Sequence, residues 1–201
     1  MHAFGNAGSS GILLFVFVAL DWRRRVSPLR SGRRFRGNDK IKGVTMDSLH
    51  ATAISFSGMG CLILGDSGTG KSRLAADALM LGAKLIADDR VRLMSNNGFV
   101  VAASVPELAG VLEIRGFGLI RLHENQLVSP HNLHLVVALD AQSDTRLPEL
   151  ETQSFFGIEL PFLRLPPVPR SSASALLLYL HSMQSGRILP TDWIPKRANR
   201  E

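Results

Sequence analysis

Short apolar runs separated by glycine and polar turn residues dominate the chain after about residue 48, a spacing typical of strands joined by turns. Strands are predicted at residues 49–56, 61–64, 83–87, 91–94, 99–103, 112–120, 133–139 and 158–164. Apolar residues recur at helical spacing over 72–81, and again from a serine cap at Ser171 or Ser172 to about Met183. The pattern predicts an α/β fold with a twisted mixed sheet flanked by helices.

Turn residues between these runs predict some of the connections. Ser57-Gly58-Met59-Gly60 predicts a hairpin between the first two strands, and Ser95-Asn96-Asn97-Gly98 predicts a second one. The continuous apolar run 133–139 indicates a strand buried on both faces. Pro161 restricts the strand at 158–164 to an edge of the sheet, because proline cannot donate to a ladder of hydrogen bonds.

The turn between the predicted strand 61–64 and the helix 72–81 matches the Walker A pattern G-x-x-x-x-G-K-[ST]. The matching residues, all candidates for nucleotide binding, are Gly65, Asp66, Ser67, Gly68, Thr69, Gly70, Lys71 and Ser72. Strand, glycine-rich turn and helix are the context in which this motif binds phosphates through backbone N–H groups. Lys71 is expected to contact the terminal phosphates, and the hydroxyl of Ser72 is expected to bind Mg²⁺. The alternative is a glycine-rich turn that matches by chance.

Acidic residues follow the next strand. Asp88 and Asp89 come directly after the run 83–87, and ligands in α/β sheets bind beyond the carboxyl ends of strands. One carboxylate could hold a metal ion through water, and one could accept a proton from an attacking hydroxyl. Glu113 and Arg115 alternate onto one face of a predicted strand, which suits a metal ion and a phosphate side by side. The alternatives are a solvated turn for the aspartates and an ordinary ion pair for Glu113 and Arg115.

Charge is distributed unevenly along the 201 residues. Residues 1–45 hold nine Lys and Arg against Asp21 and Asp39, so the rest of the chain holds 14 Lys and Arg against 15 Asp and Glu. The pI near 10.2 therefore reflects an N-terminal segment rather than the core. We expect no specific nucleic-acid partner.

Three segments are expected: a basic extension at 1–45, a P-loop kinase domain at 46–183 and a polar tail at 184–201. The apolar run 11–20 is about half as long as a transmembrane helix, so no membrane span is predicted. The extension could be a membrane-surface anchor, a non-specific nucleic-acid contact, or an over-extended reading frame upstream of Met46.

Cysteine and histidine usage excludes several kinds of site. Cys61 is the one cysteine of the chain and lies in an apolar strand, so neither an intramolecular disulfide nor a multi-cysteine metal site can form. Nothing indicates an oxidising compartment, and we expect a cytoplasmic location. The histidines at 123, 131, 134 and 181 show no metal-ligand spacing.

Four stretches in a fixed order resemble the catalytic domain of HPr kinase/phosphorylase over roughly residues 46–183. They are Leu49-His50-Ala51, the P-loop at 65–72, Ile86-Ala87-Asp88-Asp89-Arg90-Val91 and Leu112-Glu113-Ile114-Arg115-Gly116-Phe117-Gly118. The resemblance implies an HPr kinase/phosphoenolpyruvate carboxykinase-like fold, in the short form that lacks the family's N-terminal domain. It also implies ATP and Mg²⁺ as cofactors, HPr or an HPr-like phosphocarrier as protein partner, and a homo-oligomer, since the family is hexameric.

The resemblance also implies the chemistry and the roles of residues. The family phosphorylates a serine of HPr with ATP and reverses the reaction with inorganic phosphate, which yields pyrophosphate. By resemblance, Asp89 is the base, His50 orients it, and Arg146 assists phosphoryl transfer. By resemblance, Lys71 and the loop amides hold the donor phosphates, and Ser72 and Glu113 hold Mg²⁺. Their positions in the sequence make Arg115 a further candidate for nucleotide binding and Asp88 a further candidate metal ligand.

The chain departs from the family pattern at several positions. Arg73 stands where the family has an acidic residue, Ala51 replaces a glycine, and Pro167-Val168-Pro169-Arg170-Ser171 replaces a Pro-Gly-Arg-Asn element. These changes concern the protein substrate and allosteric response rather than nucleotide chemistry. Two other hypotheses therefore stay open: a P-loop kinase for a small metabolite, and a regulatory module that senses ATP, pyrophosphate or phosphate.

Overall fold

The computed structural model describes residues 45–140 and 151–188, with the backbone alone for 45–47. The first strands are β1 (Thr45–His50), β2 (Thr52–Phe56), β3 (Met59–Gly65), β4 (Lys84–Ala87), β5 (Arg90–Asn96) and β6 (Phe99–Ser104). The others are β7 (Val111–Ile114), β8 (Gly118–Arg121), β9 (His131–Leu139), β10 (Glu151–Phe155) and β11 (Ile158–Leu165). The helices are α2 (Lys71–Met80), α3 (Ala173–Ser185) and two short 3₁₀ turns at Pro106–Leu108 and Glu124–Gln126.

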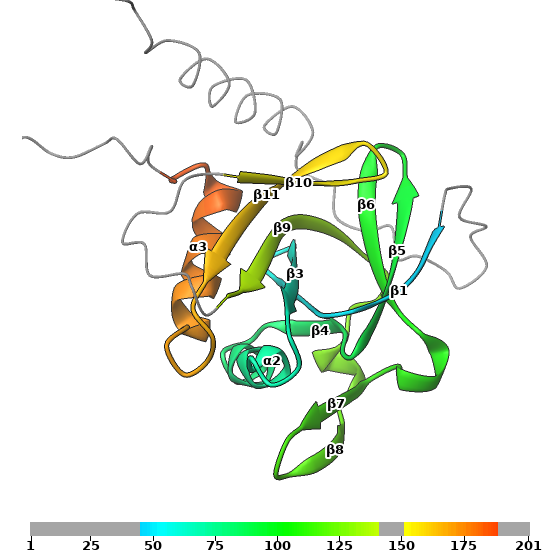
Figure 1. Cartoon of the computed structure of the whole chain (residues 1–201), viewed down its shortest axis with the longest axis vertical. Coiled ribbons are helices and arrows are strands. Elements are labelled where there is room, and N and C mark those ends of the chain that lie inside the picture. The colour runs from blue at the N-terminus through cyan, green and yellow to red at the C-terminus, as the bar shows by residue number, and fades with distance from the viewer. Residues whose placement is uncertain (1–44, 141–150, 189–201) are drawn as a thin grey trace, which may run out of the picture. The chain divides into compact units, whose positions relative to one another are not determined.

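Nine strands form one mixed sheet in the order β1-β5-β6-β9-β3-β2-β4, with β11 also paired to β9 and β10 paired to β11 (Figure 1). β3 and β11 run parallel to β9, whereas the other pairs in this sheet are antiparallel. Helices α2 and α3 contact each other and both pack against β2 and β3, so they cover the same face of the sheet. The predicted α/β fold with a mixed sheet and flanking helices is confirmed.

The hydrophobic core lies where the central strands meet. One cluster of buried side chains comprises Ala51, Ala53, Leu62, Ile86, Ala87, Val91, Leu93, Val100, Ala102, Leu133, Val136, Phe155, Leu160 and Phe162. The predicted buried strand at 133–139 is confirmed as the inner part of β9. Helix α3 begins at the predicted cap Ser172, whose hydroxyl accepts from the Ala175 N–H, and buries Leu176, Leu177, Leu180 and Met183 as expected. Leu81 was expected on the buried side of α2, but it follows the last helical residue and is 53% exposed.

The N-terminal part of the sheet differs from the expected single strand at 49–56. The chain changes partners at the buried Ala51: β1 pairs with β5, whereas β2 pairs with β3 and β4. The hairpin between β2 and β3 is confirmed, but its turn is only Ser57 and Gly58, since Met59 and Gly60 already belong to β3.

Two further predictions about strands were wrong. The expected strand 112–120 is a separate hairpin of β7 and β8 that turns at residues 115–117. β11 is not an edge strand, because it pairs with β10 on one side and with β9 on the other. Its Pro161 is tolerated because the pairing with β9 begins one residue later, at Phe162. Strand β10 was not expected at all.

Candidate functional site

Four segments meet at one edge of the sheet. β3 and β4 are both antiparallel to β2, so they run parallel to each other and their carboxyl ends lie at the same edge. The start of β2 lies at this edge as well. The topology thus brings four segments into one site. They are the loop after β3, Asp88 and Asp89 after β4, His50 at the end of β1, and Thr52 at the start of β2.

The loop after β3 has the geometry of a phosphate cradle. It turns through glycines with positive φ and passes directly into α2, where the Leu74 N–H donates to Gly70 O at 2.8 Å. No side chain caps the N-terminus of α2, so its first N–H groups and its positive dipole end face the loop. Gly70 is required sterically, since a Cβ there would lie 2.6 Å from the Cβ of Val168. All these features suit a polyphosphate.

Lys71 is nearly buried, with 6% of its surface exposed. Its ammonium group donates to the carbonyl oxygens of Gly65 at 2.7 Å and Asp66 at 3.1 Å, and lies 3.2 Å from Nε2 of His50. Burial lowers the pKa of Lys71, and the nearby aspartates, Asp88 first, oppose that shift. Because an ammonium group can only donate, Nε2 of His50 is the acceptor of this contact, which leaves Nδ1 as the ring nitrogen that carries a hydrogen.

That Nδ1–H group points at Asp89. Nδ1 of His50 lies 3.0 Å from Oδ1 and 3.2 Å from the backbone oxygen of Asp89. Asp89 itself has φ of 64°, unusual for a residue with a side chain, in a tight turn where the Arg90 N–H donates to Asp88 O at 2.7 Å. About half of the Asp89 side chain is exposed. The structure thus presents an oriented carboxylate that solvent and substrate can reach.

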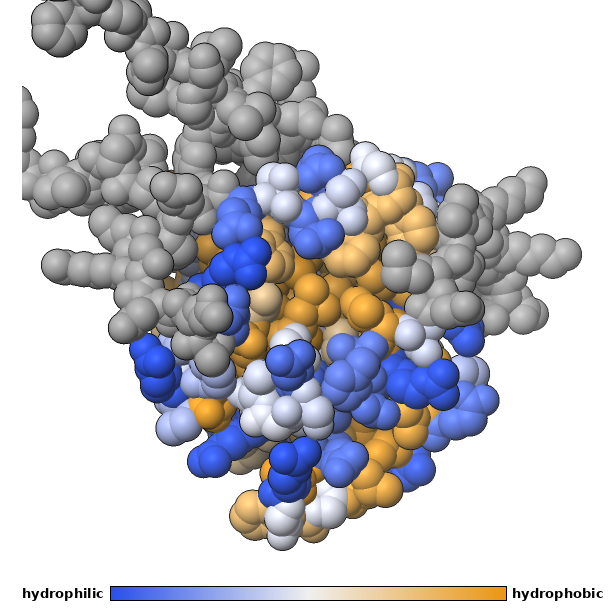
Figure 2. Space-filling view, in the orientation of Figure 1, coloured by the Kyte–Doolittle hydropathy of each residue, from blue (hydrophilic) through white to orange (hydrophobic). Residues whose placement is uncertain are grey.

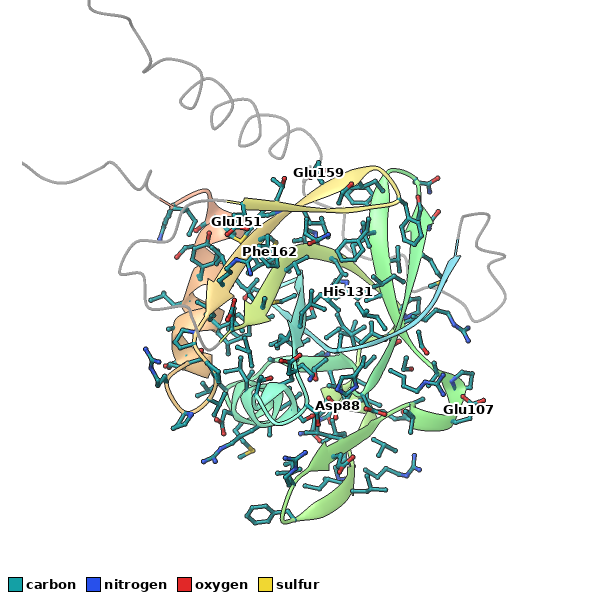
Figure 3. The ribbon with its side chains drawn as sticks, in the orientation of Figure 1. Asp88, Glu107, His131, Glu151, Glu159 and Phe162 are labelled. Atoms are coloured by element: carbon teal, nitrogen blue, oxygen red, sulfur yellow. The ribbon has the colours of Figure 1, made fainter. Side chains whose placement is uncertain are left out.

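Asp88, by contrast, is buried, and Figure 3 shows it between α2 and the hairpin of β7 and β8. Its Oδ1 accepts from the hydroxyls of Thr52 at 2.6 Å and Ser72 at 3.0 Å. Its Oδ2 accepts from the backbone N–H of Glu113 at 3.2 Å. One carboxylate therefore connects β2, the start of α2 and β7.

Glu113 and Arg115 do not share a strand face as expected, because β7 ends at Ile114 and Arg115 lies in the turn. Both side chains are exposed. The Arg115 guanidinium reaches across to the P-loop: its Nη2 lies 3.5 Å from the Ser67 hydroxyl, and its Nη1 lies 3.4 Å from a Cβ built on Gly68. The hairpin turn therefore places a cation beside the phosphate cradle.

The donor groups fit a nucleotide-bound magnesium ion. In the part of the chain that the structure describes, no three His, Cys, Asp or Glu side chains lie close enough to hold a metal by themselves. Mg²⁺ at nucleotide sites keeps several waters and takes only one or two protein ligands together with substrate phosphates. The Ser72 hydroxyl and the adjacent Asp88 carboxylate are such a set.

The segment before α3 forms a wall of the site that hydrophobic pattern and motifs, without the family resemblance, did not indicate. The backbone N–H of Val168 donates to Thr69 O at 3.1 Å, and the Val168 side chain packs on Gly70. The residues that depart from the family's Pro-Gly-Arg-Asn element therefore contact the P-loop directly. The family resemblance was the only signal in the sequence that this segment belongs to the site.

The remaining predicted site residue is Arg146, and two histidines that were not site candidates lie away from the site. Arg146 lies outside the described residues. His131 and His134 lie at the opposite end of β9, where Nε2 of His131 is 2.6 Å from the Ser55 hydroxyl and Nδ1 of His134 accepts from the Gly60 N–H at 3.0 Å. These two rings therefore form hydrogen bonds with polar groups of β2 and β3.

Comparison with known proteins shows the family of this chain. A family model described as "HPr Serine kinase C-terminal domain" matches residues 44–180. The chain belongs to the HPr serine kinase C-terminal domain family. A curated relative, the HPr kinase/phosphorylase of Levilactobacillus brevis, is 34% identical over 129 residues, covering 59% of this chain and 42% of that protein. The HPr kinase/phosphorylase of Clostridium beijerinckii is 30% identical over 165 residues, covering 75% and 54%.

The structure of this chain is also similar to a solved structure. The Hpr(Ser) kinase/phosphatase from Coxiella burnetii superposes with a TM-score of 0.62 at 25% identity, covering 70% of this chain and 93% of that chain. The chain spans about half the length of the curated relatives that it matches. Among the helices that the structure describes, none is long and apolar enough to cross a membrane.

Proposed function

We propose that this chain is an ATP- and Mg²⁺-dependent kinase/phosphorylase that acts on a serine of HPr or an HPr-like phosphocarrier. The observation that carries the proposal is a pair of contacts through one ring: His50 contacts the Lys71 ammonium group with Nε2 and the Asp89 carboxylate with Nδ1. These contacts hold an oriented carboxylate beside the phosphate cradle. The names of the relatives, HPr kinase/phosphorylase and Hpr(Ser) kinase/phosphatase, support the same reaction.

In the forward reaction, the loop amides and Lys71 hold the donor phosphates while Arg115 adds a cation at the rim. A magnesium ion, when bound, offsets the charge of the phosphates, and Ser72, Asp88 and Glu113 are the residues proposed to hold it directly or through water. Asp89 accepts the proton of the attacking serine hydroxyl. The Nδ1–H of His50 fixes the orientation of Asp89, so that an oxygen of the carboxylate faces the acceptor.

The phosphorolysis is proposed to use the same groups, because it too transfers a phosphoryl group between the serine oxygen and a phosphate oxygen held at the loop. Inorganic phosphate attacks the phosphoserine, pyrophosphate forms, and the protonated Asp89 returns its proton to the leaving serine oxygen. Arg146 is proposed to assist both directions. The proposal further includes a cytoplasmic location, a homo-oligomer, and a kinase domain over residues 46–183, from within β1 to within α3.

The surface beside the site favours a protein over a small metabolite as acceptor. Phe117 and Leu119 on the hairpin are 86% and 74% exposed. Figure 2 shows apolar colour along the lower edge of the molecule, where Figure 1 places this hairpin. Exposed apolar side chains next to a phosphate site suit contact with a macromolecule.

Transfer to HPr is the direct test. The full chain is incubated with Mg²⁺, ATP labelled on the terminal phosphate and purified HPr, with HPr lacking its acceptor serine as control. We expect label on the intact HPr alone, and release of pyrophosphate when phosphorylated HPr meets inorganic phosphate. Nucleotide binding without transfer to any acceptor would instead support the regulatory module.

A further inference from the structure

Thr52 places a hydroxyl among fully buried side chains at the start of β2. It is 0% exposed, and so are its neighbours Ala51, Ala53 and Ile54. A buried hydroxyl without a partner is unfavourable, and valine would fill the same volume without this penalty. The threonine is therefore explained by its hydrogen bond rather than by packing.

That bond goes to the carboxylate at the centre of the site. The Thr52 hydroxyl donates to Oδ1 of Asp88 at 2.6 Å, the shortest of the three hydrogen bonds that Asp88 accepts. The other two donors, the Ser72 hydroxyl and the Glu113 N–H, come from segments that the proposed function uses. Thr52 belongs to β2, which is paired on both sides, so it links the carboxylate to a buried strand of the sheet.

The orientation of Asp88 decides the orientation of Ser72. A serine hydroxyl has one hydrogen and two lone pairs. When its hydrogen points to Oδ1 of Asp88, as the 3.0 Å distance indicates, both lone pairs are available to a cation on the other side. If Asp88 could rotate, the hydroxyl would rotate with it and the lone pairs would lose their fixed direction.

We infer that Thr52 is a positioning residue for magnesium: through Asp88 it fixes the Ser72 hydroxyl in the direction that binds the nucleotide-associated ion. The inference rests on the proposed nucleotide site but not on the protein acceptor. Residues that orient metal ligands from behind usually change metal affinity by about 10- to 100-fold when replaced.

The test compares Thr52→Val with Thr52→Ser in the full chain. Mg²⁺ is titrated calorimetrically into protein held with a non-hydrolysable ATP analogue, so that the readout is binding rather than turnover. Thr52→Val should need at least about tenfold more Mg²⁺ for half-saturation. Thr52→Ser keeps the donor and should stay close to the unmodified chain.

Ser55 provides the matched control. It lies on the same strand, is 6% exposed, and pairs with His131 at the far end of the sheet. Ser55→Ala should lower the melting temperature, as any lost buried hydrogen bond does, but leave the Mg²⁺ requirement unchanged. If Thr52→Val does not fold, Thr52→Cys, with its weak donor, takes its place and should show an intermediate loss.

Two results would overturn the inference. Equal Mg²⁺ requirements for Thr52→Val, Thr52→Ser and the unmodified chain would show that Thr52 serves packing alone. Equal losses in Thr52→Val and Ser55→Ala would show a general loss of stability. If the unmodified chain bound no nucleotide, the proposed function would fall as well, whereas failure of transfer to HPr alone would leave the inference standing.

Discussion

Asp89 combines two properties that point to chemistry rather than structure. Its backbone has φ of 64°, a conformation that is unfavourable for residues with a side chain, and its carboxylate is half exposed yet held by His50. Strain of this kind persists where neighbouring structure enforces it. Here the enforcing contacts are the turn to Arg90 and the hydrogen bonds from the His50 ring.

Asp89→Asn should abolish phosphoryl transfer in both directions. An amide is nearly isosteric but cannot take the serine proton, so we expect the transfer rate to fall by about 10²- to 10⁴-fold. Affinity for the ATP analogue should change little in calorimetry, because Lys71 and the loop remain. Asp77→Asn, on the exposed side of α2, is the matched control and should change neither quantity. Loss of nucleotide affinity with intact transfer chemistry would show that Asp89 is not the base.

His134 makes stability depend on pH at the far end of the sheet. Burial lowers its pKa from 6.5 to about 4, assisted by the neighbouring His131. The unfolded chain therefore binds a proton between pH 6.5 and 4 that the folded chain does not bind, so stability falls as pH falls through this window. At pH 5 the expected loss relative to pH 7 is roughly 2 kcal/mol.

Urea unfolding at pH 7 and pH 5 measures this contribution. His134→Gln removes the titrating group, so the difference in unfolding free energy between the two pH values should shrink relative to the unmodified chain. His181→Gln, on an exposed position of α3, should leave that difference as it was. If the difference in unfolding free energy between pH 7 and pH 5 were the same in His134→Gln as in the unmodified chain, His134 would be protonated in the folded protein without loss of stability.

At the scale of elements, the P-loop and the segment before α3 act as one unit. The Thr69 carbonyl oxygen of the loop accepts a hydrogen bond from the Val168 N–H, and Gly70 leaves room for the Val168 side chain. The conformation of the phosphate cradle therefore depends on a segment roughly 100 residues away in sequence.

Two glycine substitutions separate this contact from backbone strain. Gly70 and Gly58 both have positive φ, 94° and 80°, but a Cβ on Gly58 would meet nothing within 4 Å. Gly58→Ala should cost only the strain of that conformation, about 1–2 kcal/mol in thermal unfolding. Gly70→Ala should cost more and weaken nucleotide binding, because Val168 must move. Adding Val168→Ala to Gly70→Ala should restore part of the lost stability and part of the lost nucleotide affinity. Equal effects of Gly58→Ala and Gly70→Ala on these two quantities would refute the coupling between the loop and Val168.

Sequence patterns predicted the elements whose signals are local. The strand–loop–helix unit at 61–81 and the hairpin at 91–103 follow from apolar spacing, glycines and turn residues that lie next to one another. The β10 strand was missed because Glu151-Thr152-Gln153-Ser154-Phe155 has little apolar pattern and pairs with β11 alone. The turn at 115–117 was missed because the apolar residues of β8 continue the run of β7, although they are exposed.

The residues proposed for the site divide in the same way. The motif predicted Lys71 and Ser72, and the family resemblance implied Asp89, His50 and Glu113. The contribution of Thr52 could not be predicted, because its partner Asp88 lies 36 residues away and only the pairing of β2 with β4 brings them together.

At the scale of the molecule, the topology explains how a site can form although each element contributes only a few residues to it. β2 lies between β3 and β4 and is antiparallel to both, so its beginning meets the ends of its two neighbours. A parallel β2 would place Thr52 at the opposite edge, beside the histidines. The reversal of this one strand thus brings residues from four segments to a single edge.

The concentration of positive charge in the N-terminal segment predicts how the chain should behave without that segment. The buried cluster lies entirely between Ala51 and Phe162, and the family model begins at residue 44. We therefore expect a chain without residues 1–43 to unfold cooperatively near the same temperature and to bind the ATP analogue with the same affinity. The remaining residues carry 14 Lys and Arg against 15 Asp and Glu, so binding to heparin at low salt should be lost.

Deletion of residues 1–50 is the matched control. It also removes β1, which pairs with β5, and with it His50, which contacts both Lys71 and Asp89. This shorter chain should lose thermal stability and phosphoryl transfer, because β5 loses a partner and the proposed base loses its orienting group. If the chain without 1–43 already behaved like the chain without 1–50, the basic segment would be part of the kinase unit. The boundary proposed at β1 would then be wrong, since the first strand would need residues before it to hold His50 against the P-loop lysine.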